Sequence, residues 1–387
     1  MKFTSLQMRD RMKSVNQLRR ASSMSLNITA AVVQDFGYPM AIEELRLVAP
    51  AEHDIIVRTE ASSFCITDEM QSTGQIGRTP PPMILGHSAV GVVEEIGAGV
   101  TRMKVGDRVI VPATAECGQC YFCSRGRSDQ CELHLIPARH VASRPDGTAV
   151  FAGAGTAATY ATHMNLREIS AFPVSSDLPA EELAMVGCGV ASGLGAVFNV
   201  AKVEPGSSVA VVGAGHFGLW IVQGCRVAGA EQIIVVEPRS ERRAVALELG
   251  ATHVVDPALG DPVEQVRELT SGRGADYTFE ASGPPSAMVE AFHMARNAGT
   301  VVLAGVETAQ SEVTFPAQML AVRGRTIHSV QNGNLRMTRD IKRFVRMMER
   351  GLVNAAPIAT GRYRLEDINK AVAAAKEGTD LSGIIIP

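Results

Sequence analysis

The sequence predicts an α/β protein, with a doubly wound parallel sheet in the second half of the chain joined to a mainly β region in the first half. Short β-type runs broken by Gly and Pro fill residues 28–178, and strands alternate with helices from about residue 205 onward. Apolar residues make up 46% of the 387 residues, which is enough for sizeable cores. A chain of this length is expected to form two or three domains.

The elements follow in order along the chain. No long helical pattern interrupts the first region, whose β-type runs include residues 54–58, 89–96 and 108–111. The second region opens with a buried strand at 207–212, a glycine-rich turn and an apolar helix through Ala228. After it come strands at 232–236, 253–255, 276–279 and 300–304, and helices at 240–249, 262–269 and 285–298. The final part contains helices near 339–350 and 365–377 and a terminal strand at 384–386.

Charge and hydropathy exclude two classes of partner. The formal net charge is −3 and the isoelectric point is near 6.3, so no basic footprint for nucleic acid is indicated. No stretch reaches the ~20 consecutive apolar residues of a membrane-spanning helix. We therefore expect neither a nucleic acid nor a membrane as partner.

The first 27 residues are basic and Ser-rich and contain no apolar segment, which excludes a secretory signal. One interpretation is an organelle transit peptide. The favoured one is a disordered tail that precedes Met24 as the natural start, and with it we expect a cytoplasmic location.

A dinucleotide site is indicated by Gly213-x-Gly215-x-x-Gly218 between the predicted strand and helix. Gly213 permits the tight turn, Gly215 lets the backbone approach a pyrophosphate, and Gly218 lets helix and strand pack closely. Glu237 ends the next strand, near the ~20-residue offset of a carboxylate that binds the adenosine ribose hydroxyls. Because a carboxylate repels a 2′-phosphate, NAD is favoured over NADP. The alternative is a glycine-rich turn without a ligand.

Three basic residues follow that carboxylate: Arg239, Arg242 and Arg243. They could soften the preference for NAD, although arginines at a helix start are more often solvated.

Four of the seven cysteines share one short loop and have metal-ligand spacing: Cys117, Cys120, Cys123 and Cys131. Four thiolates suit a tetrahedral ion such as zinc, and a site with no open position is structural. The loop has little apolar sequence of its own, so the metal is expected to hold it together. A redox or disulfide role is the alternative.

Of the other cysteines, Cys225 lies mid-helix among apolar residues and is expected to be a small core residue. Cys65 and Cys188, together with His87, match the two-Cys, one-His set of a catalytic zinc with an open fourth position. Taken singly, His87 is more often a structural histidine, and spacing alone does not show that the three converge.

From about residue 28 to 387 the pattern resembles the zinc-dependent medium-chain alcohol dehydrogenases, closest to aryl and benzyl alcohol dehydrogenases. The matching stretches are Cys65–Asp68, Gly86-His87, the four-cysteine loop, Gly187-Cys188-Gly189, and Gly213–Gly218 followed by Glu237. The resemblance implies a Rossmann NAD-binding domain, residues 190–332, inserted into a GroES-like catalytic domain, residues 28–189 and 333–387. The structural zinc loop would be residues 117–131.

The resemblance also implies roles for individual residues and two zinc ions per subunit. Cys65, His87 and Cys188 would bind the catalytic zinc, and Asp68 would orient His87. Thr67 would accept the proton of the alcohol and pass it to the nicotinamide ribose. Zinc lowers the pKa of an alcohol, and NAD then takes the hydride. Besides the glycine turn and Glu237, the residues assigned to the cofactor are Ser192, His216, Phe217 and Arg242.

Several positions depart from the family pattern. Ser88 stands where the family usually has Glu, and Ser382 stands where that acid meets a cation, so both halves of a charge pair are absent. Ile66 replaces a basic residue found in many relatives. The pyrophosphate would thus lose two cations, and we hypothesise that His216 at the helix N-terminus partly replaces them. The alternative is a polar residue without a ligand.

Two further differences bear on the substrate. Met70 occupies the place of a relay histidine, so Thr67 and the ribose would hand protons directly to water. Ala113 stands where many relatives have an aromatic ring, which predicts a wide pocket with Phe151 and Val306 as further lining residues. Both features favour aryl or allylic alcohols.

Three functions remain in competition. The leading one is an NAD-dependent zinc alcohol dehydrogenase for bulky primary alcohols and aldehydes. The second is a secondary-alcohol or glutathione-adduct dehydrogenase on the same scaffold. The third is a non-catalytic nucleotide-binding relative, against which stands the presence of all seven expected zinc ligands. The apolar run 299–306 is expected to end the nucleotide-binding sheet. Relatives pair this region across a two-fold axis, so a homodimer or homotetramer is expected. The alternative is a last strand that is covered within one subunit.

Overall fold

The computed structural model describes residues 26–387 except 78, 134–137, 154–156, 307 and 309. The predicted leader therefore lies almost wholly outside the described residues. The first strand, β1, begins at Asn27, one residue before the expected start of the catalytic domain.

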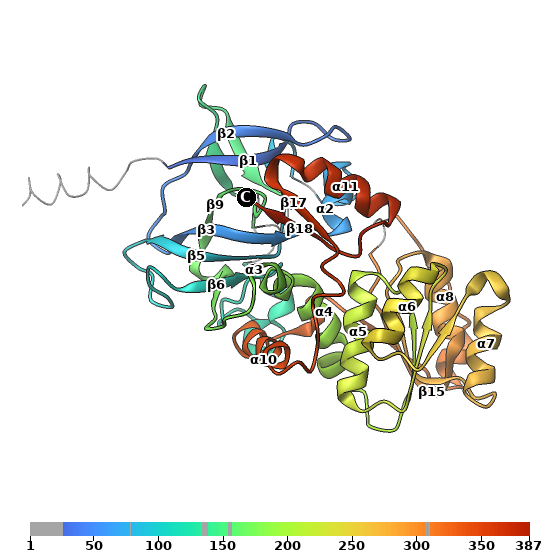
Figure 1. The fold of residues 1–387 in the computed structure, drawn as a ribbon. Helices are drawn as coiled ribbons and strands as arrows, with labels where there is room; N and C mark the ends of the chain where they lie inside the picture. Colours follow the sequence, from blue (N-terminus) through green and yellow to red (C-terminus); the bar gives the residue numbers. More distant parts are fainter. Residues whose placement is uncertain (1–25, 78, 134–137, 154–156, 307, 309) are drawn as a thin grey trace, which may run out of the picture.

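Two β-structures form the larger part of the fold, at the left in Figure 1. A closed barrel has the strand order β1 (Asn27–Val33), β2 (Ala41–Leu47), β7 (His140–Ser143), β8 (Ala149–Ala152), β4 (Met83–Ile84). Beside it a seven-stranded sheet runs β10 (Phe172–Pro173), β6 (Arg108–Val111), β5 (Ala89–Ile96), β3 (Asp54–Ser63), β18 (Gly383–Ile386), β17 (Gly361–Arg364), and β9 (His163–Arg167) pairs with β3. These strands confirm the mainly β first region.

The third sheet is parallel throughout and lies in the other part of the molecule. Its order is β13 (His253–Val255), β12 (Gln232–Val236), β11 (Ser208–Val212), β14 (Ala275–Glu280), β15 (Ala295–Leu303), β16 (Thr326–Ser329). In chain order this is 3-2-1-4-5-6, the doubly wound arrangement of dinucleotide-binding domains. Its helices are α5 (His216–Ala228), α6 (Ser240–Leu249), α7 (Pro262–Leu269), α8 (Pro285–Met294) and the short α9 (Ala317–Ala321). The predicted fold class is confirmed.

The chain returns to the first part after this sheet. Helix α10 (Met337–Glu349) lies near β6, while α11 (Ile368–Glu377), β17 and β18 lie beside the N-terminal strands (Figure 1). Strand β18 pairs with β3 through Ile384 opposite Ser63. The nucleotide-binding sheet is therefore an insertion between two parts of one β-rich unit.

A long helical segment, Ala180–Ala201, connects the two parts. It contains α3 (Ala180–Leu183), α4 (Ala191–Gly195) and two wider π-helical turns at Val186–Val190 and Ala196–Ala201. Its length and composition would suffice to cross a membrane, but 72% of its most apolar stretch is buried inside the protein. It is thus a core helix, and the predicted domain boundary at residues 189 and 190 falls inside it.

Several elements differ from the sequence prediction, which contains no counterpart of the helical segment Ala180–Ala201 or of α9. Helix α8 ends at Met294 rather than at residue 298, because Ala295 adopts an extended backbone and pairs with Ala275. Strand β16 has no counterpart among the predicted strands, and the expectation that the run 299–306 ends the sheet is wrong, because β15 lies between β14 and β16. The pattern of β16 is mostly exposed, so it shows none of the burial that marks the other strands of this sheet.

Candidate active site and zinc centres

Three segments from distant parts of the sequence bring Cys65, His87 and Cys188 together. Cys65 caps α2 (Ile66–Ser72) just after β3, His87 lies between β4 and β5, and Cys188 lies in the first π-helical turn. Their ligand atoms all lie within 4.8 Å of one another, and His87 Nε2 is 3.3 Å from Cys188 Sγ. Donors around a tetrahedral zinc are roughly 3.3–3.8 Å apart, given Zn–S and Zn–N bonds of about 2.3 and 2.0 Å. The donor set and its spacing fit one zinc ion.

The carboxylate of Asp68 lies directly behind this cluster and is fully buried. Its Oδ1 lies 3.1 Å from His87 Nδ1 and accepts from the backbone N–H of Gly86, also at 3.1 Å. Its Oδ2 accepts from the Cys65 N–H at 3.3 Å and from the Tyr160 hydroxyl at 2.7 Å. A proton on His87 Nδ1 leaves Nε2 free as a metal ligand, so Asp68 lies where it can orient the ligating histidine.

The three ligand side chains shift one another's pKa values. The hydrogen bond with Cys188 lowers the pKa of Cys65 well below its usual value and raises that of Cys188. Burial opposes a charge on His87, but Asp68 and Cys188 together raise the pKa of His87 well above its usual value. Thiolate character at Cys65 is what a zinc ligand needs.

Thr67 lies in the first turn of α2, next to the cluster. Its hydroxyl donates to Cys65 Sγ at 3.2 Å. The hydroxyl is thus directed at the candidate metal site, where the family resemblance places it, and its role in proton transfer stays a prediction.

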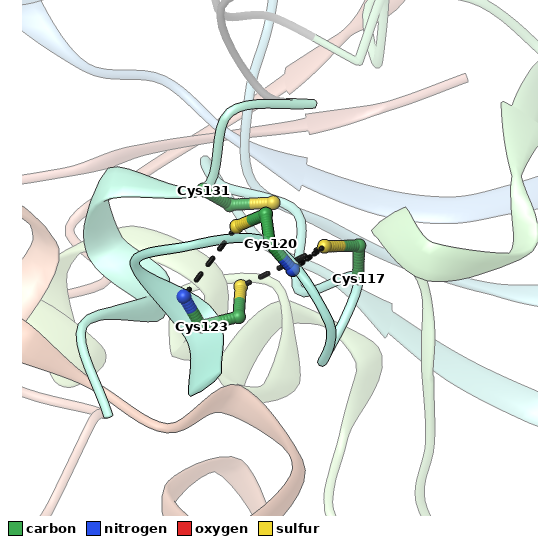
Figure 2. Close-up of side chains that lie close together, drawn as sticks. All are labelled: Cys117, Cys120, Cys123 and Cys131. Atoms are coloured by element: carbon green, nitrogen blue, oxygen red, sulfur yellow. Dashed lines mark hydrogen bonds between the residues drawn. The ribbon is translucent and has the colours of Figure 1, made fainter. Parts of the chain in front are cut away.

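The four-cysteine loop brings its thiols together as the spacing predicts (Figure 2). Cys117 Sγ and Cys123 Sγ are 3.9 Å apart, and backbone N–H groups of Cys120 and Cys123 donate to the sulfurs of Cys117 and Cys120. Desolvation raises the pKa of the Cys120 thiol, but hydrogen bonds from the backbone N–H groups of Cys123 and Glu132 lower it. The resulting pKa of Cys120 is about 6. Four thiol ligands with no open position form a structural zinc site.

The glycine turn has the geometry that the motif predicts. Gly213 has φ +98°, and a Cβ on Gly218 would lie 1.9 Å from the Gly213 carbonyl oxygen, so both positions need glycine. Glu237 is buried, and its carboxylate accepts from the N–H of Ala214 at 2.8 Å and of Arg239 at 3.0 Å. The predicted ribose ligand therefore also holds the turn itself.

The other residues assigned to the cofactor lie on three different helices, with Phe217 and Arg242 near the turn and Ser192 on α4. Arg242 donates to the Gly378 carbonyl at 3.1 Å, and Ser192 donates to Asn332 at 3.1 Å. Phe217 packs half-buried against the core. Their contacts to a cofactor stay predictions.

His216 begins α5 and faces the zinc ligands. A Cβ on Gly189 would lie 1.7 Å from His216 Nε2, so the imidazole packs directly against the residue after Cys188. Its Nδ1 is buried with no hydrogen-bond partner among the described residues. Burial lowers the pKa of His216. The lowered pKa disfavours the positive charge that the sequence suggests for His216, and its contact with a cofactor stays a prediction.

The three residues predicted to line the substrate pocket lie in different places. The N–H of Ala113 donates to the Gly187 carbonyl at 3.1 Å, one residue from Cys188. Phe151 lies on β8, opposite Met83 and 5.9 Å from the His140 ring centre. Val306 is half-exposed just after β15. Only Ala113 is linked to the zinc cluster by a described contact.

The positions that depart from the family pattern have local partners. Ser88 is buried and donates to the Ala184 carbonyl at 2.6 Å, and Ser382 lies 3.3 Å from the Ser63 hydroxyl. No buried charge is left unpaired by these replacements. Ile66 is 46% exposed at the start of α2, next to Thr67.

Tyr160 is a partner of Asp68 that lies outside the segments matching the family pattern. It is fully buried and stacks on Phe64, with ring centres 6.1 Å apart. Burial and the charge of Asp68 raise the pKa of Tyr160, so its phenol stays protonated and donates. No motif marks this tyrosine, since only the fold brings it to Asp68.

Comparison with known proteins agrees with this site. A family model for the alcohol dehydrogenase GroES-like domain matches residues 51–174, and one for zinc-binding dehydrogenases matches residues 217–350. The chain is 34% identical over 366 residues to the S-(hydroxymethyl)glutathione dehydrogenase of Synechocystis, covering 92% of this chain and 98% of that protein. It is 33% identical over 371 residues to the geraniol dehydrogenase of Castellaniella defragrans, covering 93% and 98%.

A solved structure is similar over the same extent. The benzyl alcohol dehydrogenase of Acinetobacter calcoaceticus has a TM-score of 0.87 at 29% identity, over 93% of this chain and 99% of that chain. The two zinc-ligand clusters, the Rossmann fold and the relatives that match more than nine tenths of the chain all indicate the same family. The chain belongs to the zinc-dependent medium-chain alcohol dehydrogenase family.

Proposed function

We propose that this dehydrogenase interconverts bulky primary alcohols, aryl or allylic, and their aldehydes with NAD. The convergence of Cys65, His87 and Cys188 carries the activity. The substrate class is supported by the similarity to a geraniol and a benzyl alcohol dehydrogenase. The N–H of Ala113 donates to the carbonyl of Gly187, the residue before Cys188. The small side chain of Ala113 at this place supports a wide pocket.

Each residue near the zinc cluster would have a separate role in the reaction. A zinc ion held by Cys65, His87 and Cys188 supplies the Lewis acidity that lowers the pKa of an alcohol, and NAD supplies the hydride acceptor. Thr67 Oγ1, which lies beside the cluster, would accept the proton of the alcohol. Asp68 keeps the proton of His87 on Nδ1. Met70 cannot carry a proton, so protons would pass from Thr67 to water without a relay histidine.

The preference for NAD over NADP is supported by the surroundings of Glu237. Arg239 donates to the carbonyls of Gly378 and Glu377 at 2.9 and 2.7 Å, and Arg242 also binds Gly378. Arg243 lies 2.9 Å from Asp256. These contacts hold the three guanidinium groups toward the end of α11 and toward Asp256, while the carboxylate of Glu237 repels a 2′-phosphate.

The relative from Synechocystis supports a second candidate substrate, S-(hydroxymethyl)glutathione. That substrate carries two carboxylates, whereas Ala113, the predicted lining residue with a contact beside the zinc cluster, is apolar. This small apolar side chain favours the aryl or allylic substrate.

Initial rates of NADH formation test the proposal. We expect turnover of benzyl alcohol and geraniol with NAD that a zinc chelator abolishes, with much slower turnover of ethanol, of S-(hydroxymethyl)glutathione, and with NADP. A faster rate with the glutathione adduct would instead establish the second candidate. No turnover of any of these alcohols would contradict the proposed activity.

Replacing Ala113 by Trp tests the wide pocket. The indole would fill space beside Gly187, so kcat/KM for benzyl alcohol should fall at least about 10-fold more than for ethanol, the range over which apolar pockets discriminate by size. Ethanol in the same variant is the internal control, since damage to the zinc site would lower both rates. Equal losses for the two alcohols would refute the pocket assignment.

Replacing His216 by Ala tests its contribution to the cofactor. If Nδ1 or Nε2 binds the cofactor, the Kd for NADH should rise roughly 3- to 10-fold, the value of one hydrogen bond. Fluorescence titration of NADH measures it. His253→Ala, on the edge strand β13, is the matched control and should leave the Kd unchanged. An unchanged affinity in the His216 variant would exclude a cofactor contact.

We also propose a homodimer or homotetramer. Strand β16 ends its sheet and pairs only with β15 among the described strands, and its residues are mostly exposed. An unpaired edge of this kind is a template for pairing with a second copy.

A further inference from the structure

The carboxylate of Asp68 is buried without a Lys or Arg partner among the described residues. A buried charge of this kind depends on its hydrogen bonds. Three of its four donors belong to the metal-binding segments themselves: Cys65, Gly86 and His87. The fourth, the Tyr160 hydroxyl, is the shortest at 2.7 Å and comes from elsewhere in the fold.

The backbone around Tyr160 is held on both sides. Its carbonyl accepts from the Ala31 N–H at 2.9 Å, on β1 of the barrel, and its N–H donates to the Leu85 carbonyl at 3.2 Å. Its ring stacks on Phe64, the residue before Cys65. Tyr160 is therefore anchored both to the barrel and to the segment that carries His87, while its hydroxyl contacts Asp68 on α2.

The two oxygens of Asp68 have separate partners. Oδ2 receives the Tyr160 hydroxyl and the Cys65 N–H, and Oδ1 lies toward His87 Nδ1 and the Gly86 N–H. Rotation of the carboxylate would break the bond to Tyr160 and move Oδ1 away from His87. The tyrosine thus restrains the very rotation that would release the imidazole.

We propose that Tyr160 is a positioning residue for the catalytic metal, holding Asp68 in the one orientation that points His87 Nε2 at the ion. The inference deepens the proposed function because it rests on the same zinc site. It does not depend on which alcohol the enzyme uses. The hydroxyl acts only through Asp68 and touches neither the metal nor the substrate.

The test is Tyr160→Phe in the full-length chain, which removes the hydroxyl and keeps the ring on Phe64. We expect metal affinity at the catalytic site to fall about 10- to 100-fold, the loss typical of outer partners of a ligating histidine. Chelator competition measures that affinity. In cobalt-substituted protein the ligand-field bands of the catalytic site should shift, kcat should fall more than KM rises, and the four-cysteine site should keep its metal.

Tyr363→Phe is the matched control. Tyr363 lies on β17 and its hydroxyl also donates to a carboxylate, that of Asp380, which contacts none of the zinc ligands. This variant should keep the affinity, the cobalt spectrum and the rate of the parent chain. Unchanged metal affinity and spectrum in Tyr160→Phe, or equal losses in both variants, would overturn the proposal.

A double-mutant cycle with Asp68→Asn separates positioning from packing. If Tyr160 acts through Asp68, the double variant should lose no more metal affinity than Asp68→Asn alone. If Tyr160→Phe causes independent structural damage, the two losses of binding free energy should sum in the double variant. Additive losses would contradict the proposal. Because metal affinity is measured without substrate, failure of the substrate assignment would leave this result intact.

Discussion

Replacing Cys188 by Ala is expected to reduce the zinc content from two ions to one per chain and to lower dehydrogenase activity at least about 10³-fold. Cys188 Sγ lies 3.3 Å from His87 Nε2, so its loss leaves two protein ligands for an ion that needs three. Without the ion, nothing in the pocket lowers the pKa of an alcohol. Zinc content by elemental analysis and the benzyl alcohol assay measure the two effects.

The matched control is Cys225→Ala. Cys225 is fully buried on α5, and burial alone raises the pKa of its thiol, which marks it as a core residue rather than a ligand. This variant should keep both zinc ions and lose some stability only, since truncating a core side chain leaves a small cavity. A Cys188 variant that retained both ions and full activity would disprove the assignment of the catalytic site.

Replacing Cys123 by Ala is expected to remove the structural zinc and to destabilise the fold by on the order of 3 kcal/mol, since metal binding to such loops is coupled to folding. The loop has few buried apolar side chains of its own, and Tyr121 and Phe122 are exposed. It contacts the return segment through Ser128 and the Leu335 carbonyl, and through Glu116 and Thr338. Loss of the metal should therefore also loosen the start of α10.

Thermal unfolding and zinc analysis check this second prediction. The melting temperature should fall by several degrees, with one zinc ion kept at the catalytic site and activity retained at low temperature. Cys225→Ala again serves as the control for loss of a thiol. Loss of zinc with an unchanged melting temperature would show that the loop does not need the metal.

Much of the nucleotide-binding domain follows from local sequence. The predicted bounds of β12, α6, β13 and α7 match the structure, because hydrophobic periodicity and Gly or Pro boundaries lie within each segment. The predicted end of α8 is wrong because Ala295 pairs with Ala275 of β14 and so belongs to strand β15. Strand β16 is stabilised by pairing with β15, and its own residues show no alternating pattern of burial.

The two zinc sites differ in how far the sequence alone identifies them. The four cysteines lie within one short loop, Cys117 to Cys131, so their spacing predicts the site directly. Cys65, His87 and Cys188 come from three distant segments, and spacing could not show that they meet. For these residues the family resemblance supplied the expectation, and the fold brings their ligand atoms within 4.8 Å.

The sequence by itself therefore determined the fold class, the dinucleotide turn and the structural metal loop, because each depends on interactions between residues close in the chain. Only the tertiary structure decided the contact between Tyr160 and Asp68, the position of His216 against Gly189, and the engagement of Arg239 and Arg242 by the end of α11. These contacts join segments that are far apart in the sequence. Their partners are chosen by how the barrel, the long helix and the inserted sheet pack together, which no local pattern encodes.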